Sequence, residues 1–533
     1  MRKLSLAAVA LLLSASPIAA QTADPARIID EGTNHSQVMQ TAEYLSDVIG
    51  PRMTNSPSMR VAEQWTQDQF RKWGLVDVHK EGFDFGRGWW IEKSSVRMVS
   101  PRPIQLTAIP IAWTPATRGV LSAPIVVAPM SKPEHFAAWH GKLAGKIVLV
   151  SRPGNGGEPD EAPFQRLSDA DLAKLNTYEQ PGWNPHQQAL VMKHALFEKE
   201  LTDFLAKEGA LAYATRSRSD GKLIHGEGYL HRVGETPAIP GVELAAEDYR
   251  RLARLALVGP APTLEIESNV HFDDSDRQAY NVIADIRGSD PKAGYVMAGA
   301  HLDSWVAGDG AADNGAGSAM IMEAARILAA MGVKPKRSIR FALWAGEEQS
   351  LYGSIAYIEQ HLAKRPAPER PLGADELYYS WATRYPITPL PGYKDLAAYF
   401  NIDNGSGKIR GIYAENNLAA VPIFRDWFEP FESMGASSVV IQKTEGTDHQ
   451  FMQSVGIPAF QFIQDPLDYE TRIHHTNIDT FDHLKAADMR QGAIILAAFL
   501  LNAANAEKPL PHMPIPTQPV VSDPYAYPNP DDR

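Results

Sequence analysis

The most constraining feature of this chain is the alternation of short apolar runs with helical patterns from Asp290 to Ala504. The runs have the length of buried strands, and each is followed by apolar residues at helical spacing. This order predicts an α/β fold, with a mixed, mostly parallel sheet flanked by helices. The expected strands are 294–300, 338–344, 397–402, 438–442 and 458–463, and the expected helices are 316–331, 350–362, 421–434 and 481–504.

A second region interrupts this pattern. Strand-like runs at Ile125–Ala128 and Lys146–Val150 predict a smaller, β-rich insert. After it, Ala279–Ile286 resumes a strand pattern and is expected to pair with chain that precedes the insert. The expected organisation is a signal peptide at 1–20, a main domain formed by 21–118 and 265–506, an insert at 119–264, and a proline-rich tail at 507–533 that lies extended on the surface.

The first twenty residues have the order of a signal peptide. Basic residues at Arg2 and Lys3 precede the apolar run Leu4–Leu13, and small residues lead to Ala20. An uncleaved anchor is the alternative, but the run is shorter than the roughly 20 residues of a spanning helix. We therefore expect cleavage after Ala20, no stable membrane insertion afterwards, and a periplasmic or secreted bacterial protein.

Charge and cysteine content exclude several classes of protein. The 533 residues carry a formal net charge of −12, the wrong sign for a protein that follows a nucleic acid backbone. The chain has no cysteine, so any metal must be held by imidazoles and carboxylates. The sequence leaves the oligomeric state open, with a homodimer among the assemblies that it allows.

Five polar motifs follow the expected strands. Each alone has an ordinary explanation, such as a helix cap or a solvated acid pair. The carboxyl ends of parallel strands meet at one edge, so together they place two imidazoles and several carboxylates there. Such a set suits two zinc-type ions if one carboxylate bridges them. The motifs are His301-Leu302-Asp303, Gly310–Gly317 around Asp313, Gly346-Glu347-Glu348, Asn401–Gly405 with Asp403, and His474–Thr480 with His475.

In the first motif, residues i and i+2 of an extended segment share a face. The carboxylate of Asp303 is therefore expected to accept the second ring N–H of His301 and to orient that imidazole.

The order and setting of these motifs resemble the co-catalytic di-zinc aminopeptidase and glutamate carboxypeptidase family. The resemblance includes Ile49–Arg52 and Tyr280–Ile283. The insert is similar to a protease-associated domain at 145–150, 209–210 and 237–242, which favours the carboxypeptidase Q-like branch. The resemblance implies a zinc-peptidase fold and a metal-dependent exopeptidase of aminopeptidase or dipeptidase type, with a short peptide as substrate.

The resemblance also implies a role for each motif. Glu347 would be the general base, and the Asp313–Asn314 peptide would be cis. His474 competes with His475, which is preferred because it directly precedes Thr476. The segment Thr447-Asp448-His449 matches a family segment near the substrate pocket, and its role stays open. One zinc ion, or another divalent ion, would sit on His301 and Asp403 and the second on Glu348 and His475, with Asp313 bridging and Asp303 as a further catalytic residue.

Three alternatives remain at this point. They are a metal-dependent amidohydrolase or deacylase, a non-catalytic receptor-like binding protein on the same fold, and a single-zinc glutaminyl cyclase. The short interval from His301 to Asp313 disfavours the first, and the complete ligand set disfavours the other two. The sequence does not decide which end of a peptide is recognised.

Overall fold

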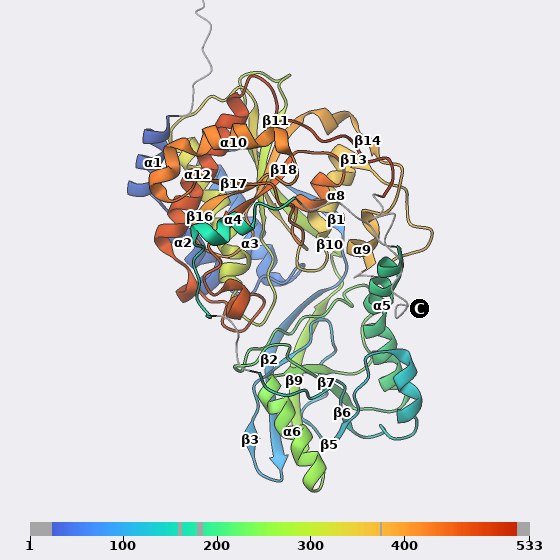
Figure 1. The fold of residues 1–533 in the computed structure, drawn as a ribbon. Coiled ribbons are helices and arrows are strands. Elements are labelled where there is room, and N and C mark those ends of the chain that lie inside the picture. The colour runs from blue at the N-terminus through green and yellow to red at the C-terminus, as the bar shows by residue number, and fades with distance from the viewer. Residues whose placement is uncertain (1–23, 158–161, 179–184, 374–375, 520–533) are drawn as a thin grey trace, which may run out of the picture.

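A computed structural model describes residues 24–157, 162–178, 185–373 and 376–519 (Figure 1). The predicted signal peptide and residues 520–533 of the predicted tail lie outside the described residues. Among the described helices, none combines the length and apolar character needed to cross a membrane.

The first sheet has eight strands in the order β1-β10-β12-β11-β15-β18-β16-β17. The neighbours β12, β11, β15 and β18 run parallel. The pairs β1–β10, β10–β12 and β18–β16 are antiparallel, and β16 pairs parallel with β17. The predicted mixed, mostly parallel sheet is therefore confirmed, including the pairing of β10 with chain before the insert. The strands are β1 Val76–Asp84, β10 Gln278–Ile286, β11 Tyr295–His301, β12 Ser338–Trp344, β15 Leu396–Asn401, β16 Ile409–Tyr413, β17 Ser438–Val440 and β18 Ala459–Gln464.

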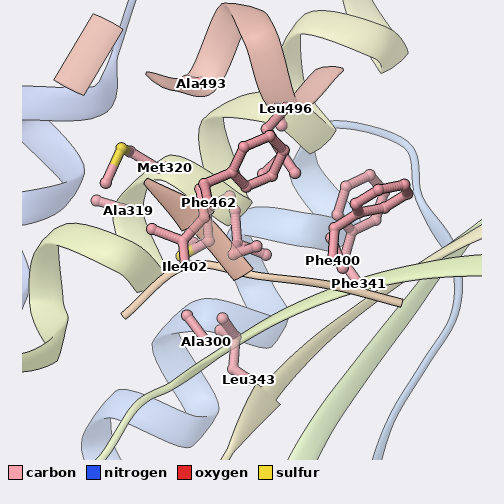
Figure 2. Packing of buried hydrophobic residues seen from close by; sticks show 14 of the residues in the cluster. Ala300, Ala319, Met320, Phe341, Leu343, Phe400, Ile402, Phe462, Ala493 and Leu496 are labelled. Carbon is pink, nitrogen blue, oxygen red and sulfur yellow. The ribbon is translucent and has the colours of Figure 1, made fainter. Parts of the chain in front are cut away.

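Helices cover both faces of this sheet because alternate strand residues point to opposite sides. On one face, strand residues such as Leu343 and Phe400 pack with α7 and α12 (Figure 2). Their neighbours Trp344 and Tyr399 join a second core with α8 and α11 on the other face. The helices of the first face are α1 Pro25–Asn34, α2 Val38–Glu43, α3 Pro57–Lys72, α7 Ala316–Ala330, α10 Val421–Phe428 and α12 Ala486–Asn505, and those of the second are α8 Tyr352–Tyr357, α9 Glu376–Trp381 and α11 His449–Gln453.

Three of the four predicted helices are interrupted. The segment 350–362 becomes α8 followed by a π-helical turn, and 421–434 becomes α10 followed by a 3-10 turn. Pro430 stands at the start of that 3-10 turn, where its missing N–H cannot continue the α-helix. The segment 481–504 begins as a 3-10 turn before α12. Apolar spacing predicted where these helices lie but not the change of helix type.

The second sheet is wider than the predicted insert. Its order is β3-β2-β9-β5-β6-β7-β8-β4. The long strands β2 and β9 pair antiparallel from Gly88–Asp273 to Ser100–Thr263, so the predicted boundaries at 119 and 264 cut through the sheet. Figure 1 shows this pair leading away from the first sheet. The elements are β2 Gly88–Ser100, β3 Ile104–Gln105, β4 Ala108–Pro110, β5 Leu121–Val127, β6 Ile147–Leu149, β7 Ala212–Arg216, β8 Gly241–Leu244, β9 Thr263–Asp273, and the helices α5 Pro185–Lys207 and α6 Ala246–Val258.

Two segments outside the sheets lie across the first domain. Residues 162–176, which include α4 (Asp169–Lys174), reach the first sheet, where Gln165 bridges Leu467 and Arg166 pairs with Asp465 at 2.8 Å. Residues 507–519 of the predicted tail have neither helix nor strand. There the carbonyl of Pro511 accepts a hydrogen bond from Asn417 Nδ2 at 2.7 Å, so this part lies along the surface.

Candidate metal centre

The predicted site residues converge at the carboxyl edge of the four parallel strands. His301 is the last residue of β11, and Glu348 follows β12. Asp403 follows β15, and the loop after β18 carries His475. Glu348, Asp403 and His475 line a cavity of about 430 Å³ together with Asp313, and His301 is buried next to these acids. The edge of the sheet thus brings together residues from nearly two hundred positions of sequence.

The first half of the centre is built around His301. Its Nε2 lies 3.2 Å from Asp313 Oδ1 and 3.3 Å from Asp403 Oδ1. Glu347 Oε2 is 3.9 Å from the same nitrogen. His301, Asp313 and Asp403 offer their ligand atoms within 4.8 Å of one another, a spacing that suits a metal ion.

The second half is built around His475. Its Nε2 lies 3.0 Å from Glu348 Oε2 and 3.2 Å from Asp313 Oδ2. Asp313 therefore turns one carboxylate oxygen toward each imidazole, which is the arrangement that a bridging ligand needs. The peptide between Asp313 and Asn314 is cis, as the family resemblance implies.

The competing imidazole of His474 is less well placed. Its Nε2 lies 3.6 Å from Asp313 Oδ2, its side chain is 37% exposed, and its ring lies 3.8 Å from that of His475. Burial and the neighbouring His475 lower the pKa of His474 to about 4, so it is neutral near pH 7. By distance it is a second choice to His475, although Asp313, His474 and His475 also form a group of ligand size.

The predicted role of the Asp303 side chain is wrong in detail. His301 Nδ1 contacts the backbone carbonyl oxygen of Asp303 at 2.9 Å, whereas the carboxylate is 3.7 Å away. That carboxylate instead accepts hydrogen bonds from the Thr54 hydroxyl and from the backbone N–H groups of Glu347 and Glu348. The carbonyl is closer to the ring than the carboxylate is, so Asp303 positions the two glutamates through its side chain and His301 through its main chain.

Two further residues support the turn that carries Asp313. The carboxylate of Asp479 accepts from the backbone N–H groups of Ala312 and Asp313 at 2.6 and 3.0 Å. The buried guanidinium of Arg52 donates to backbone carbonyls that precede this turn, at Leu302 (2.7 Å), Asp309 (2.9 Å) and Gly310 (2.6 Å). Both residues lie in sequence segments that the resemblance includes, but only the folded turn shows what they bind.

Glu227 is the site residue that the sequence did not predict. It belongs to the loop between β7 and β8 in the second-sheet region, and its Oε1 lies 2.8 Å from His475 Nδ1. Arg218 binds the same carboxylate at 2.8 Å. Burial raises the pKa of Glu227, but the contacts with His475 and Arg218 outweigh it and hold this pKa at about 2. No motif, strand end or periodicity marks Glu227, which is 248 positions from its partner.

The electrostatics of the centre fit bound cations. Within the described part of the chain, Asp313 Oδ2 and both carboxylate oxygens of Glu348 are buried without a hydrogen-bond partner. Burial raises the pKa of Glu348 to about 7 and that of Glu347 well above its usual range. Unsatisfied buried carboxylates are costly unless a cation neutralises them. Two imidazoles with these acids form a donor set that suits two ions of zinc type.

Comparisons with known proteins agree with this geometry. Residues 281–500, which contain every proposed ligand, match Peptidase family M28. Residues 281–500 are thus a peptidase family M28 region. Carboxypeptidase Q from Rattus norvegicus is 24% identical over 88% of this chain and 85% of its own, and that from Homo sapiens is 23% identical over 90% and 88%.

Solved structures confirm the M28 fold of the chain. A peptidase M28 precursor from Shewanella amazonensis has a TM-score of 0.65 at 23% identity, over 92% of this chain and 98% of its own. A zinc aminopeptidase from Bacillus subtilis has a TM-score of 0.56 at 19% identity, over 91% and 97%. These likenesses cover more than nine tenths of this chain, so the predicted fold class is confirmed.

Proposed function

We propose that this M28 chain is a metal-dependent exopeptidase that holds two zinc ions and cleaves short peptides. The observation that carries the proposal is the position of Asp313, with one carboxylate oxygen facing each of two imidazoles. One ion would be held by His301, Asp403 and Asp313, and the other by His475, Glu348 and Asp313. The convergence of all five ligands disfavours a non-catalytic binding protein on this fold.

Glu347 is the residue that would move protons. Bound zinc of this kind polarises a carbonyl and makes water more acidic. Glu347 lines the cavity beside the ligands, and its Oε2 lies 3.9 Å from His301 Nε2. Its carboxylate is not one of the five proposed metal ligands. Its carboxylate would accept a proton from the attacking water and return it to the departing amine. Hydrogen bonds from its backbone to Asp303 fix the position of this glutamate.

The charge of the cavity favours recognition of the amino end of a peptide. Two zinc ions would offset the charge of the acids at the centre, but Glu445 and Glu470 also line the cavity, and no described lining residue is Lys or Arg. Glu445 is paired with Lys443, but Glu470 pairs with no described Lys or Arg. A free α-amine would be attracted to the carboxylate of Glu470, whereas an α-carboxylate at the same place would be repelled by it. We therefore propose aminopeptidase or dipeptidase action, and not cleavage that depends on the carboxyl end alone.

Metal analysis and a substrate series test this proposal together. We expect two zinc ions per chain, hydrolysis of dipeptides and aminoacyl amides, and loss of activity with a chelator that zinc restores. Acetylation of the amino end should abolish cleavage, while amidation of the carboxyl end should have a smaller effect. Equal cleavage of acetylated and free peptides would contradict the proposed end preference, and full activity of the metal-free chain would contradict the function.

We also propose that the chain is exported, because its first twenty residues have the order of a signal peptide. Expression in a bacterium followed by fractionation should yield a mature protein that begins at Gln21 outside the cytoplasm. A cytoplasmic protein that retains Met1 would contradict export.

A further inference from the structure

The two ring nitrogens of His475 each face an acid from a different region of the molecule. Nε2 faces Glu348 and Asp313 in the first domain, and Nδ1 faces Glu227 of the second-sheet region at 2.8 Å. Arg218 donates to the same carboxylate at 2.8 Å, so this carboxylate acts as an acceptor and Nδ1 carries the hydrogen of the contact with His475. Nε2 is then left with its lone pair directed at the carboxylates of the centre.

Glu227 is held firmly in the position from which it contacts His475. The neighbouring backbone N–H of Gly226 donates to Glu243 Oε2 at 3.0 Å, and the carbonyl of Gly226 accepts from Ala112 at 2.9 Å. On the other side, a Cβ at Gly228 would lie 2.4 Å from the carbonyl oxygen of Ala112, so the backbone packs closely there. Arg218 fixes the carboxylate itself.

The loop of Glu227 and the loop of His475 are also joined directly. The backbone N–H of Ile224 donates to Asn477 Oδ1 at 2.9 Å, and the backbone N–H of Asn477 donates to the carbonyl of Ile224 at 3.1 Å. The ring of Trp305 packs edge-on against His475, with 6.1 Å between ring centroids. The imidazole therefore has little freedom to turn its Nδ1 away from Glu227.

We propose that Glu227 is a positioning residue that fixes the tautomer and orientation of His475, so that the second-sheet region completes one of the two metal sites. This inference rests on the proposed function, because it presumes that His475 is a ligand. A carboxylate behind a ligating imidazole raises its basicity and holds its plane. The imidazole of His301 is oriented within its own domain, because its Nδ1 contacts the carbonyl oxygen of Asp303.

The test measures metal binding by the full chain, independently of activity. Chelator-treated protein is titrated with Co²⁺, whose absorption bands report coordination, and with Zn²⁺ against a competing indicator. We expect Glu227→Ala to lower the affinity for one of the two metal ions by roughly 10- to 100-fold and to leave the affinity for the other unchanged. Glu227→Gln keeps an acceptor for Nδ1–H, so its loss should be smaller.

Activity should follow the occupancy of the weakened site. In Glu227→Ala, kcat should be low at limiting zinc and recover as zinc is added, with KM for a dipeptide unchanged. Glu247→Ala is the matched control, because Glu247 binds the backbone N–H groups of Gly221 and Lys222 in the same loop and touches no site residue. This control should bind both ions normally.

The outcomes separate the inference from the function on which it rests. Two ions of unchanged affinity in Glu227→Ala would overturn the inference and leave the proposed function intact. Equal losses in Glu227→Ala and Glu247→Ala would overturn it as well, because they would indicate general disturbance of the loop. A wild-type chain that binds fewer than two ions would overturn both.

Discussion

The two imidazoles of the centre are held in different ways. His301 ends a central strand, and its Nδ1 contacts the carbonyl of Asp303, two positions along the same chain segment. His475 lies in a loop with a positive φ of 61°, and its Nδ1 contacts Glu227 from the other sheet. One half of the centre is thus a local product of a strand end, and the other half requires two regions to be docked. Substitutions should therefore distinguish the two halves by which variant loses a zinc ion and which loses only activity.

The largest effect on kcat is expected from substitution of Glu347, which should slow the reaction while both metal sites keep their ions. Glu347→Gln removes the proton acceptor while keeping the size of the side chain. We expect kcat to fall by about 10²- to 10⁴-fold with two zinc ions still bound. Steady-state kinetics on a dipeptide and metal analysis of the same sample provide the measurement. A variant that kept full activity would contradict the proposed mechanism.

Substitution of each imidazole should remove one half at a time. His301→Ala and His475→Ala are each expected to bind one zinc ion instead of two, because each nitrogen serves one group of carboxylates. Activity should fall at least about 100-fold in both, since one source of transition-state stabilisation is lost. Zinc titration checks the stoichiometry. If either variant lost both ions, the halves would not be independent.

A smaller effect is expected from the carboxylate of Asp303. Asp303→Asn weakens the hydrogen bonds to the backbone of Glu347 and Glu348 but leaves the carbonyl that contacts His301. We expect kcat to fall about tenfold with zinc stoichiometry unchanged. Loss of the ion at His301 would show instead that the Asp303 side chain orients that ring. Thr54→Val, which removes one donor to the same carboxylate, should have a similar but weaker effect.

The smallest effect concerns stability and pH. Burial raises the pKa of Glu348 to about 7 in the metal-free chain, so the folded state holds a proton that the unfolded state releases near its ordinary pKa. Metal-free stability should therefore fall as pH rises from about 5 to about 7. Protons and zinc compete for this acid, so the rise in Tm caused by zinc should be several degrees larger at pH 8 than at pH 5.5. Thermal melts with zinc and with chelator measure this rise in Tm. An equal rise at pH 5.5 and pH 8 would contradict the proposed protonation of Glu348.

Sequence reasoning could predict the parts of the molecule that depend on local signals. Buried parallel strands are continuous apolar runs, and the acids and imidazoles that follow them were therefore found, including Glu348 after β12 and Asp403 after β15. The contact of Glu227 with His475 depends on how two sheets dock, and docking leaves no periodicity in either segment. The role of the Asp303 side chain was wrong because its carboxylate accepts from Thr54 and from the backbone N–H groups of Glu347 and Glu348, donors that lie far away in the sequence.

The extent of the second sheet shows the same limit. The predicted insert begins at 119, but β2 lies before that point and pairs with β9, so its place is decided by a partner strand more than 160 positions away. The breaks in the predicted helices were likewise invisible to apolar spacing, because π and 3-10 turns keep the same buried face for a few residues.

The pairing of β2 with β9 places the point where the chain enters the second-sheet region next to the point where it leaves that region. Gly88 stands opposite Asp273, and next to them Arg87 binds Asp274 with two hydrogen bonds at 2.7 and 2.9 Å. Residues 88–273 could be exchanged between relatives at two adjacent junctions, because the strand order of the first sheet does not depend on that segment. Such a graft would nevertheless carry Glu227 away, so a donor lobe must supply its own acid behind the imidazole.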